Sequence, residues 1–243
     1  MANTWAVFKR EFGGSFSTPV AFVFIVIFLV LTGILTFVFG QFFFFFQANL
    51  GSFFNFHPIL YLFLIPAISM RLWAEERKQG TVELLMTLPV TLWQAVLGKF
   101  FAAWAFTAVA LALTFPTWLT VNYLGNPDNG VIAAGYLGSL LMAGAYLSIG
   151  AAISATTKNQ VIAFVLSFVV CAVFVLLGIL APVLSTIGVP AAAVEIIGYF
   201  GFQNRFSAIT KGVIYMRDIV YFATLMVGWL FANALILQIK KAN

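Results

Sequence analysis

The run from Val20 to Phe39 constrains this chain more than any other feature, because its twenty residues include no charged side chain. At 1.5 Å per residue, a helix of this length spans about 30 Å, which matches the hydrocarbon core of a bilayer. Over the whole chain 63% of residues are hydrophobic and 8% are charged, whereas charged residues make up about a quarter of ordinary soluble domains. The sequence therefore predicts an integral membrane protein.

Further apolar runs of similar length follow, and together they predict an all-α fold with six transmembrane helices in one domain, 1–243. Unbroken apolar runs exclude a β-barrel, whose strands alternate apolar and polar residues. Thr91 and Gln94 have the spacing of a capping box at the start of the third span. We place the spans at about 20–40, 53–73, 92–119, 131–154, 160–180 and 219–239.

The N-terminal segment 1–19 carries aromatic residues at helical spacing, namely Trp5, Phe8, Phe12 and Phe16. This pattern predicts an amphipathic helix that lies in the membrane interface. The alternative is a disordered tail that leads into the first span.

The segment 182–212 precedes the last span and is interrupted by Pro182, Gly188 and Pro190. These breaks favour short helices or a hairpin on the extracytoplasmic side over a seventh span.

Span 131–154 carries two rows of small residues at four-residue spacing, which permits close approach of another helix. Packing within one subunit is the simpler expectation, and a contact between subunits is the alternative. The rows are Gly135, Ser139 and Ala143, and Gly144, Ser148 and Ala152.

The basic residues predict the orientation of the chain. In a six-span arrangement, nine of the twelve Lys and Arg residues fall on the side that holds both termini, and three fall on the other side. Because basic residues are enriched in cytoplasmic segments, both termini are predicted to be cytoplasmic. The net charge of +5 is thereby accounted for by topology, and no nucleic-acid partner is predicted.

Catalytic chemistry finds little support in the sequence. The predicted span centres carry no ionisable residue, which disfavours a carrier driven by protons or sodium. The single histidine, His57, has no acid nearby in sequence and is interpreted as a polar residue near the interface rather than a catalytic base. Metal-ligand spacing is absent, and Gly98-Lys99 lacks the rest of a phosphate-binding loop. We predict no catalytic residue, metal or cofactor in this chain.

The longest predicted cytoplasmic connection, 74–90, is built like a short helix with its own ends. Gly80 permits a chain reversal and Thr81 can cap the next helix. Glu83 lies in the first turn, where the helix dipole favours an acid, and Pro89 prevents a smooth continuation.

Leu84, Leu85 and Leu88 share one face of this predicted helix. A short amphipathic helix of this kind docks into a groove on a soluble partner or lies on lipid. The residue pattern alone favours neither.

The run from Glu75 to Pro89, Glu-Glu-Arg-Lys-Gln-Gly-Thr-Val-Glu-Leu-Leu-Met-Thr-Leu-Pro, closely resembles the cytoplasmic loop of ABC-2-type transporter permeases, especially the gliding-motility-type permease subunits. The stretch from Arg205 to Phe222 resembles the segment that leads into the last helix of the same group. It departs from the group at Arg205, where a histidine is expected, and at Ser207 and Tyr215, where acids are expected. The resemblance covers the whole chain in length and order of landmarks.

This resemblance implies the membrane half of an ATP-driven transporter, with no enzyme activity of its own. Two six-helix permeases pair in such a system, as a homodimer or with a related permease, and each contacts a separate ABC ATPase that holds ATP and Mg. The implied location is the bilayer of a bacterial cytoplasmic (inner) membrane, the implied direction is export, and an extracytoplasmic accessory protein is a further implied partner. The alternative is a membrane anchor that transmits mechanical signals between an ATPase and an extracytoplasmic partner without moving a substrate.

The resemblance also assigns residues to two sites. In the first, leucines dock on the ATPase and glutamates orient or pair with its basic groups. The ATPase-coupling residues are Glu75, Glu76, Gly80, Thr81, Glu83, Leu84, Leu85, Leu88 and Pro89. The extracytoplasmic motif consists of Phe206, Gly212, Arg217, Asp218 and Tyr221.

Overall fold

Helices are the only regular elements in the parts of the chain that the computed structural model describes, residues 2–44, 48–81 and 90–241. Six stretches of helix within these ranges are long and apolar enough to cross a membrane. The prediction of an all-α membrane fold with six spans is therefore confirmed.

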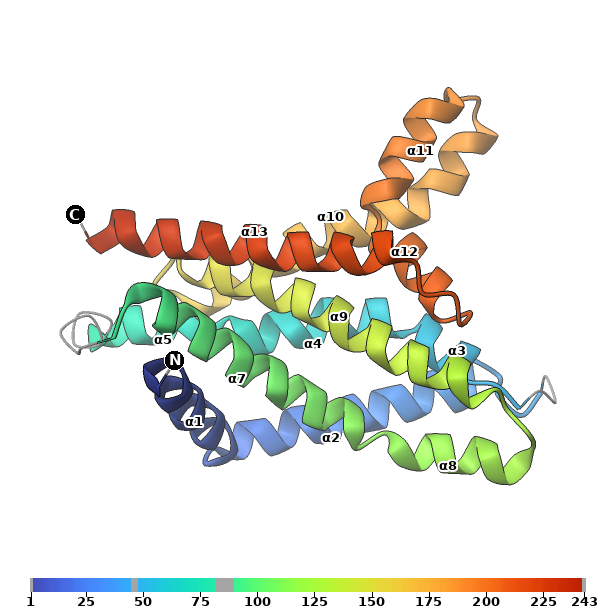
Figure 1. Cartoon of the computed structure of the whole chain (residues 1–243), viewed down its shortest axis with the longest axis horizontal. Helices are drawn as coiled ribbons and strands as arrows, with labels where there is room; N and C mark the ends of the chain where they lie inside the picture. Colours follow the sequence, from blue (N-terminus) through green and yellow to red (C-terminus); the bar gives the residue numbers. More distant parts are fainter. Residues whose placement is uncertain (1, 45–47, 82–89, 242–243) are drawn as a thin grey trace.

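The long helices lie side by side, and both chain termini are at the same end of the bundle, on the left of Figure 1. We call this the terminal end and the opposite one the far end. The membrane-length stretches are α2 with η1 (Pro19–Ile34, Leu35–Phe39), α4 with α5 (His57–Ser69, Arg71–Gln79), α7 with α8 (Leu92–Ala112, Phe115–Leu124), α9 (Asn129–Ser154), α10 (Gln160–Thr186) and α13 (Met216–Lys241).

Shorter helices occupy the two ends of the bundle. At the terminal end, α1 (Ala2–Phe16) packs closely on α7, where a Cβ added at Gly98 would lie 2.7 Å from Cγ1 of Val7. At the far end lie α3 (Gly51–Asn55), α11 (Ala191–Phe200) and α12 (Phe202–Ile209). The N-terminal segment is thus a helix rather than a disordered tail.

Several helices extend beyond their predicted ends. The second membrane stretch continues to Gln79, and the third continues to Leu124 after a break at Thr114. Helix α10 passes through Pro182 and ends at Thr186, so Pro182 does not interrupt the apolar stretch, contrary to the prediction. An interior proline removes a hydrogen bond and disfavours a helix, but the helix can continue past it. The capping box at Thr91 and Gln94 is confirmed, with both of its hydrogen bonds present.

The helix α9 lies at the centre of the bundle, and its small residues face other helices of the same chain. A Cβ added at Gly135 would lie 2.4 Å from Phe54, and one added at Gly144 would lie 2.5 Å from Met226. The rows of small residues therefore pack within one chain. Side chains from both rows are completely buried, namely those of Ser139, Ala143, Ser148 and Ala152.

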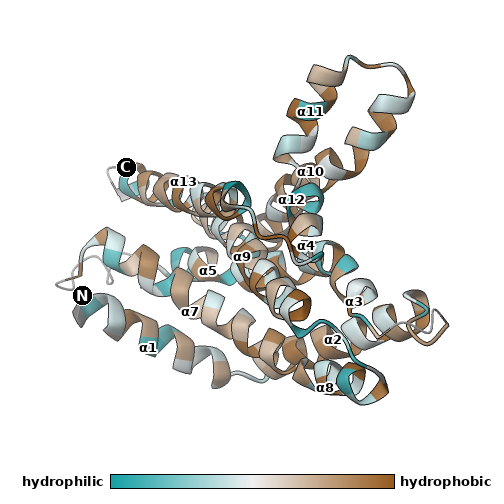
Figure 2. Cartoon of the chain, turned by 45° about the vertical axis from the view of Figure 1, so that its right-hand side comes forward, coloured by the Kyte–Doolittle hydropathy of each residue, from teal (hydrophilic) through white to brown (hydrophobic). Residues whose placement is uncertain are grey.

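The peripheral helices α2 and α10 instead have most of their apolar side chains at least partly exposed. Figure 2 shows hydrophobic residues along the lengths of the helices. Hydrophilic residues gather at α5 and at the C-terminal end of α13. This distribution suits a bundle whose sides face hydrocarbon.

After α10 the chain reverses and forms a helical hairpin that projects from the bundle, at the upper right of Figure 1. Gly188 adopts a positive φ of 83°, and Pro190 is the N-cap of α11. Two short helices, α11 and α12, thus occupy most of the segment between Pro182 and Gly212.

Candidate functional site

The helix α5 leads directly into the predicted coupling segment, and it is held against the end of α9. A break at Met70 separates it from α4 and leaves backbone groups without partners inside the helix. The hydroxyl of Ser154 accepts hydrogen bonds from the backbone N–H groups of Trp73 (3.1 Å) and Ala74 (3.0 Å), and it donates to the carbonyl of Met70 (2.9 Å). The position of α5 is therefore fixed by α9.

Gly80 ends α5 in the left-handed conformation, with φ 71°, and its N–H donates to the carbonyl of Glu76. The hydroxyl of Thr81 donates to the same carbonyl at 3.3 Å. Thr81 thus bonds back onto α5. The other predicted coupling residues, Glu83, Leu84, Leu85, Leu88 and Pro89, lie outside the described residues, and their roles stay predictions.

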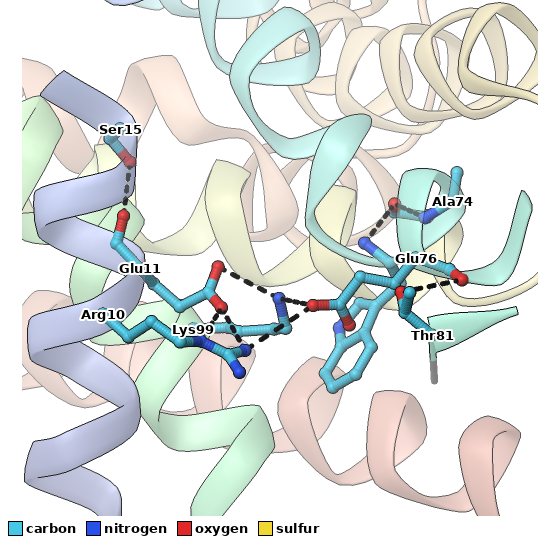
Figure 3. Close-up of polar contacts among 9 residues, drawn as sticks. Arg10, Glu11, Ser15, Ala74, Glu76, Thr81 and Lys99 are labelled. Carbon is cyan, nitrogen blue, oxygen red and sulfur yellow. Dashed lines mark hydrogen bonds and ion pairs between the residues drawn. The ribbon is translucent and has the colours of Figure 1, made fainter. Parts of the chain in front are cut away.

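Four charged residues from three helices meet beside α5, and we call them the three-helix ion cluster: Arg10 and Glu11 of α1, Glu76 of α5 and Lys99 of α7. Nζ of Lys99 lies 3.0 Å from Oε2 of Glu11 and 2.8 Å from Oε1 of Glu76 (Figure 3). An Nη atom of Arg10 lies 2.6 Å from Glu11 and 3.7 Å from Glu76. The cluster therefore ties the base of the predicted coupling segment to α1 and α7.

The burial of Lys99 explains why the cluster contains close ion pairs. The side chain of Lys99 is only 3% exposed, so its charge needs close partners. Its Nζ also lies 5.3 Å from the ring centroid of the fully buried Trp73, which adds a cation–π contact. Burial raises the pKa of Glu11, but Lys99 and Arg10 together outweigh burial and lower this pKa below its usual value. Glu11 is accordingly ionised at neutral pH.

Among the predicted coupling residues, Glu76 is engaged within the chain, since it pairs with Lys99 rather than standing free for a partner. Its second carboxylate oxygen, Oε2, is buried without a hydrogen-bond partner among the described residues. Glu75 is half-buried and lines a cavity next to the cluster.

Sequence reasoning missed Lys99 and Glu11 as members of a site. The available signal was the position of Lys99, two helical turns inside a long apolar helix, because a buried cation in such a helix requires an anionic partner. That signal does not identify the partner, since Glu11 and Glu76 belong to other helices.

A second buried ion pair lies at the far end, where Arg205 of α12 meets Asp218 of α13. An Nη atom of Arg205 lies 2.9 Å from Oδ1 of Asp218, and neither side chain is more than 7% exposed. The guanidinium also lies 3.6 Å from the ring centroid of Tyr199, and the hydroxyl of Tyr221 donates to the carbonyl of Phe200 at 2.6 Å. Arg205, which stands where the resemblance predicts a histidine, thus forms the pair with Asp218.

The other residues of the extracytoplasmic motif differ in how deeply they are buried around this pair. Phe206 is buried. Gly212 has a positive φ of 84°, and a Cβ added at this residue would lie 2.8 Å from Cγ2 of Val131. Arg217 is 62% exposed, and its Nε is 3.8 Å from Asp218. The structure therefore brings Asp218 and Tyr221 together with Arg205 and leaves Arg217 at the surface.

The single histidine is a further buried polar group. His57 is completely buried within the chain, and its Nδ1 donates to the carbonyl of Phe53 at 2.9 Å. Its position near the membrane interface stays a prediction. Within the described ranges, no group of three or more His, Cys, Asp or Glu residues is arranged to hold a metal ion. The polar contacts of these sites join helices, and the three-helix ion cluster joins α1, α5 and α7, which are far apart in the sequence.

Comparison with known proteins gives one family match. The family model described as "ABC-2 family transporter protein" matches residues 5–237. The matched region includes both buried ion clusters and runs from α1 into α13. No curated protein matches the chain.

Proposed function

Because the chain belongs to the ABC-2 family of transporter proteins, we propose that it couples ATP hydrolysis on a separate ATPase subunit to the export of a substrate. Family membership makes the chain a multi-pass membrane permease component of an ABC transporter, and the permeases of this family generally pair with an ABC ATPase. The direction of transport and the coupling route are our proposal.

The observation that carries this proposal is the three-helix ion cluster at the base of the predicted coupling segment. Glu76 lies one helical turn before Gly80, so a movement of the segment after Gly80 acts first on Glu76. From Glu76 the contacts continue through Lys99 to Glu11, and thus from α5 to α7 and α1. Closure of the ATPase would shift the permease between two states through these contacts.

The distribution of basic residues supports a cytoplasmic position for the terminal end. We propose that the ATPase, with its ATP and Mg, binds there and that the membrane is a bacterial inner membrane. A second copy of the chain, or a related permease, completes the membrane part in this proposal. An extracytoplasmic accessory protein at the far end is proposed on the resemblance to gliding-motility-type permeases.

The test is to co-express the chain with the ABC ATPase that this proposal expects among the neighbouring genes, and to measure ATP hydrolysis and ATP-dependent movement of lipids, peptides and glycans in proteoliposomes. We expect Leu84→Asp and Glu83→Lys to abolish transport while the membrane fold and the hydrolysis of ATP persist. Ile187→Asp introduces a charge at an exposed position of the far end and serves as the matched control.

Normal co-purification with the ATPase and normal transport in both variants would overturn the coupling role. A stable wild-type complex that hydrolyses ATP but moves none of these substrates would instead support the anchor without transport activity.

A further inference from the structure

A cavity of about 350 Å³ lies at the terminal end, between α1, α2, α4, α5 and α7. Pockets that hold small molecules usually measure about 300–1,000 Å³. One part of its wall is apolar, and the other part carries charges of both signs. The charged residues of the wall are Arg10, Glu11, Arg71, Glu75, Glu76 and Lys99.

The three-helix ion cluster leaves part of this charged wall without partners. Within the described residues, Arg71 and Glu75 form no ion pair within 4 Å, and Nε of Arg71 and Oε2 of Glu76 are buried without a hydrogen-bond partner. Buried donors and acceptors are usually paired, so both atoms point to a ligand. Arg71 fits an anionic oxygen, and the two glutamates fit a cationic N–H donor.

The apolar part of the wall continues towards the middle of the bundle. It includes Phe24 of α2, Ile68 of α4 and Phe106 of α7. The same three residues begin a narrow apolar crevice that extends to Phe28 and Tyr61. The charged residues belong to α1, α5 and the first part of α7, at the terminal end, whereas the crevice runs inwards between α2, α4 and α7. The cavity is therefore polar on one side and apolar on the other, like a lipid where its headgroup joins its acyl chains.

We propose that this cavity binds the headgroup of a phospholipid of the phosphatidylethanolamine type. The phosphate lies on Arg71, the primary ammonium donates to Glu75 and Glu76, and the first methylenes contact Phe24 and Phe106. The wall carries three carboxylates and three basic side chains, so its charges balance, which fits a headgroup without net charge. A quaternary ammonium lacks the N–H donor that Oε2 of Glu76 needs. Binding requires neither an ATPase nor transport, so this inference goes beyond the proposed function and does not depend on it.

The experiment uses the purified full chain in phosphatidylcholine nanodiscs that contain a trace of photoreactive phosphatidylethanolamine, with the reactive group near the start of an acyl chain. We expect labelled peptides around Phe24, Ile68 and Phe106. Unlabelled phosphatidylethanolamine should compete for this labelling. Photoreactive phosphatidylglycerol should label these peptides about tenfold less, as expected for the loss of one charged hydrogen bond.

Two neighbouring glycines of α1 provide a matched pair of variants. A Cβ added at Gly13 or Gly14 meets no atom within 4 Å, but only Gly14 lines the cavity. Gly14→Leu should therefore reduce labelling about tenfold, and Gly13→Leu should leave it unchanged. Arg71→Gln should reduce labelling to a similar extent, whereas Lys78→Gln, at an exposed position of α5, should not.

Three outcomes would overturn the proposal. The first is equal labelling by the phosphatidylglycerol probe. The second is unchanged labelling in both Gly14→Leu and Arg71→Gln. The third is competition by free phosphoethanolamine as effective as that by the lipid, which would assign the cavity to a soluble ligand. Failure of the transport test leaves this assay unaffected, so the two proposals fail separately.

Discussion

The two ends of the molecule each bury a basic side chain, but they pair it in different ways. At the far end, Arg205 has one carboxylate partner, Asp218, in the helix that follows its own. At the terminal end, Lys99 has two carboxylate partners on two other helices, and Arg10 shares both of them. The far-end pair is therefore a local link between consecutive helices, whereas the three-helix ion cluster holds distant parts of the chain together.

The two ends should therefore respond differently to substitution, both in how much stability is lost and in how many helices are affected. Arg205 has no second carboxylate within 4 Å among the described residues, so the far end should tolerate the loss of Asp218 least. The three-helix ion cluster retains a cation when Lys99 is lost, but its disturbance reaches three helices. Variants at the two ends can therefore separate the stabilising effect of a buried charge pair from its effect on the coupling between helices.

The largest loss of stability is expected for Asp218→Asn. It leaves the guanidinium of Arg205 buried without a counter-charge, and breaking a buried ion pair in this way costs about 3–5 kcal/mol. The measurement is the free energy of unfolding in mixed detergent micelles. The control is the double variant Arg205→Met with Asp218→Leu, which removes both charges and should recover most of the loss. A loss below about 1 kcal/mol for Asp218→Asn would show that the pair is not buried in the folded protein.

The next largest loss is expected for Lys99→Met, at about 2–3 kcal/mol, because Arg10 still lies close to both carboxylates. Its effect should spread further than that of Asp218→Asn. Amide hydrogen exchange should increase in α1, α5 and α7, whereas Asp218→Asn should increase it only in α12 and α13. Lys78→Met, at an exposed position of α5, is the matched control. Increased exchange confined to α7 would contradict the link between the three helices.

The sequence predicts the number of spans and some local ends well, because these depend on residues that are close in the chain. Twenty apolar residues specify a span, and Thr91 with Gln94 specifies a cap. The partners of Lys99 were not predictable in this way, since helical periodicity relates only residues within a few turns of one helix. Arg205 illustrates a second limit, because the resemblance predicted a site in its segment, but only the folded chain pairs its guanidinium with Asp218.

A smaller effect is expected from the protonation of Glu11. Its folded-state pKa is lowered from 4.5, so its stabilising contribution is complete above the unfolded pKa and is lost as the pH falls through the folded value. The difference in unfolding free energy between the wild type and Glu11→Gln should thus be constant from about pH 8 to 5.5 and should shrink below about pH 4.5. Glu195→Gln changes an exposed glutamate that forms no ion pair within the described residues, and it is the matched control. A difference that grows on acidification would contradict the lowered pKa.

The smallest effect is expected for Arg217→Ala. This variant tests whether a basic side chain that is close to Asp218 but exposed contributes to the free energy of unfolding. Nε of Arg217 is 3.8 Å from the same carboxylate that Arg205 binds, but its side chain is 62% exposed. Water and ions screen such a pair, so the loss should be below about 1 kcal/mol, and it should disappear when unfolding is measured at high salt. A loss as large as that of Asp218→Asn would mean that Arg217 is the functional partner of Asp218, and the far end would then resemble the shared pairing of the terminal end. A small and salt-sensitive loss would confirm that burial, rather than the number of nearby charges, makes the far-end pair essential.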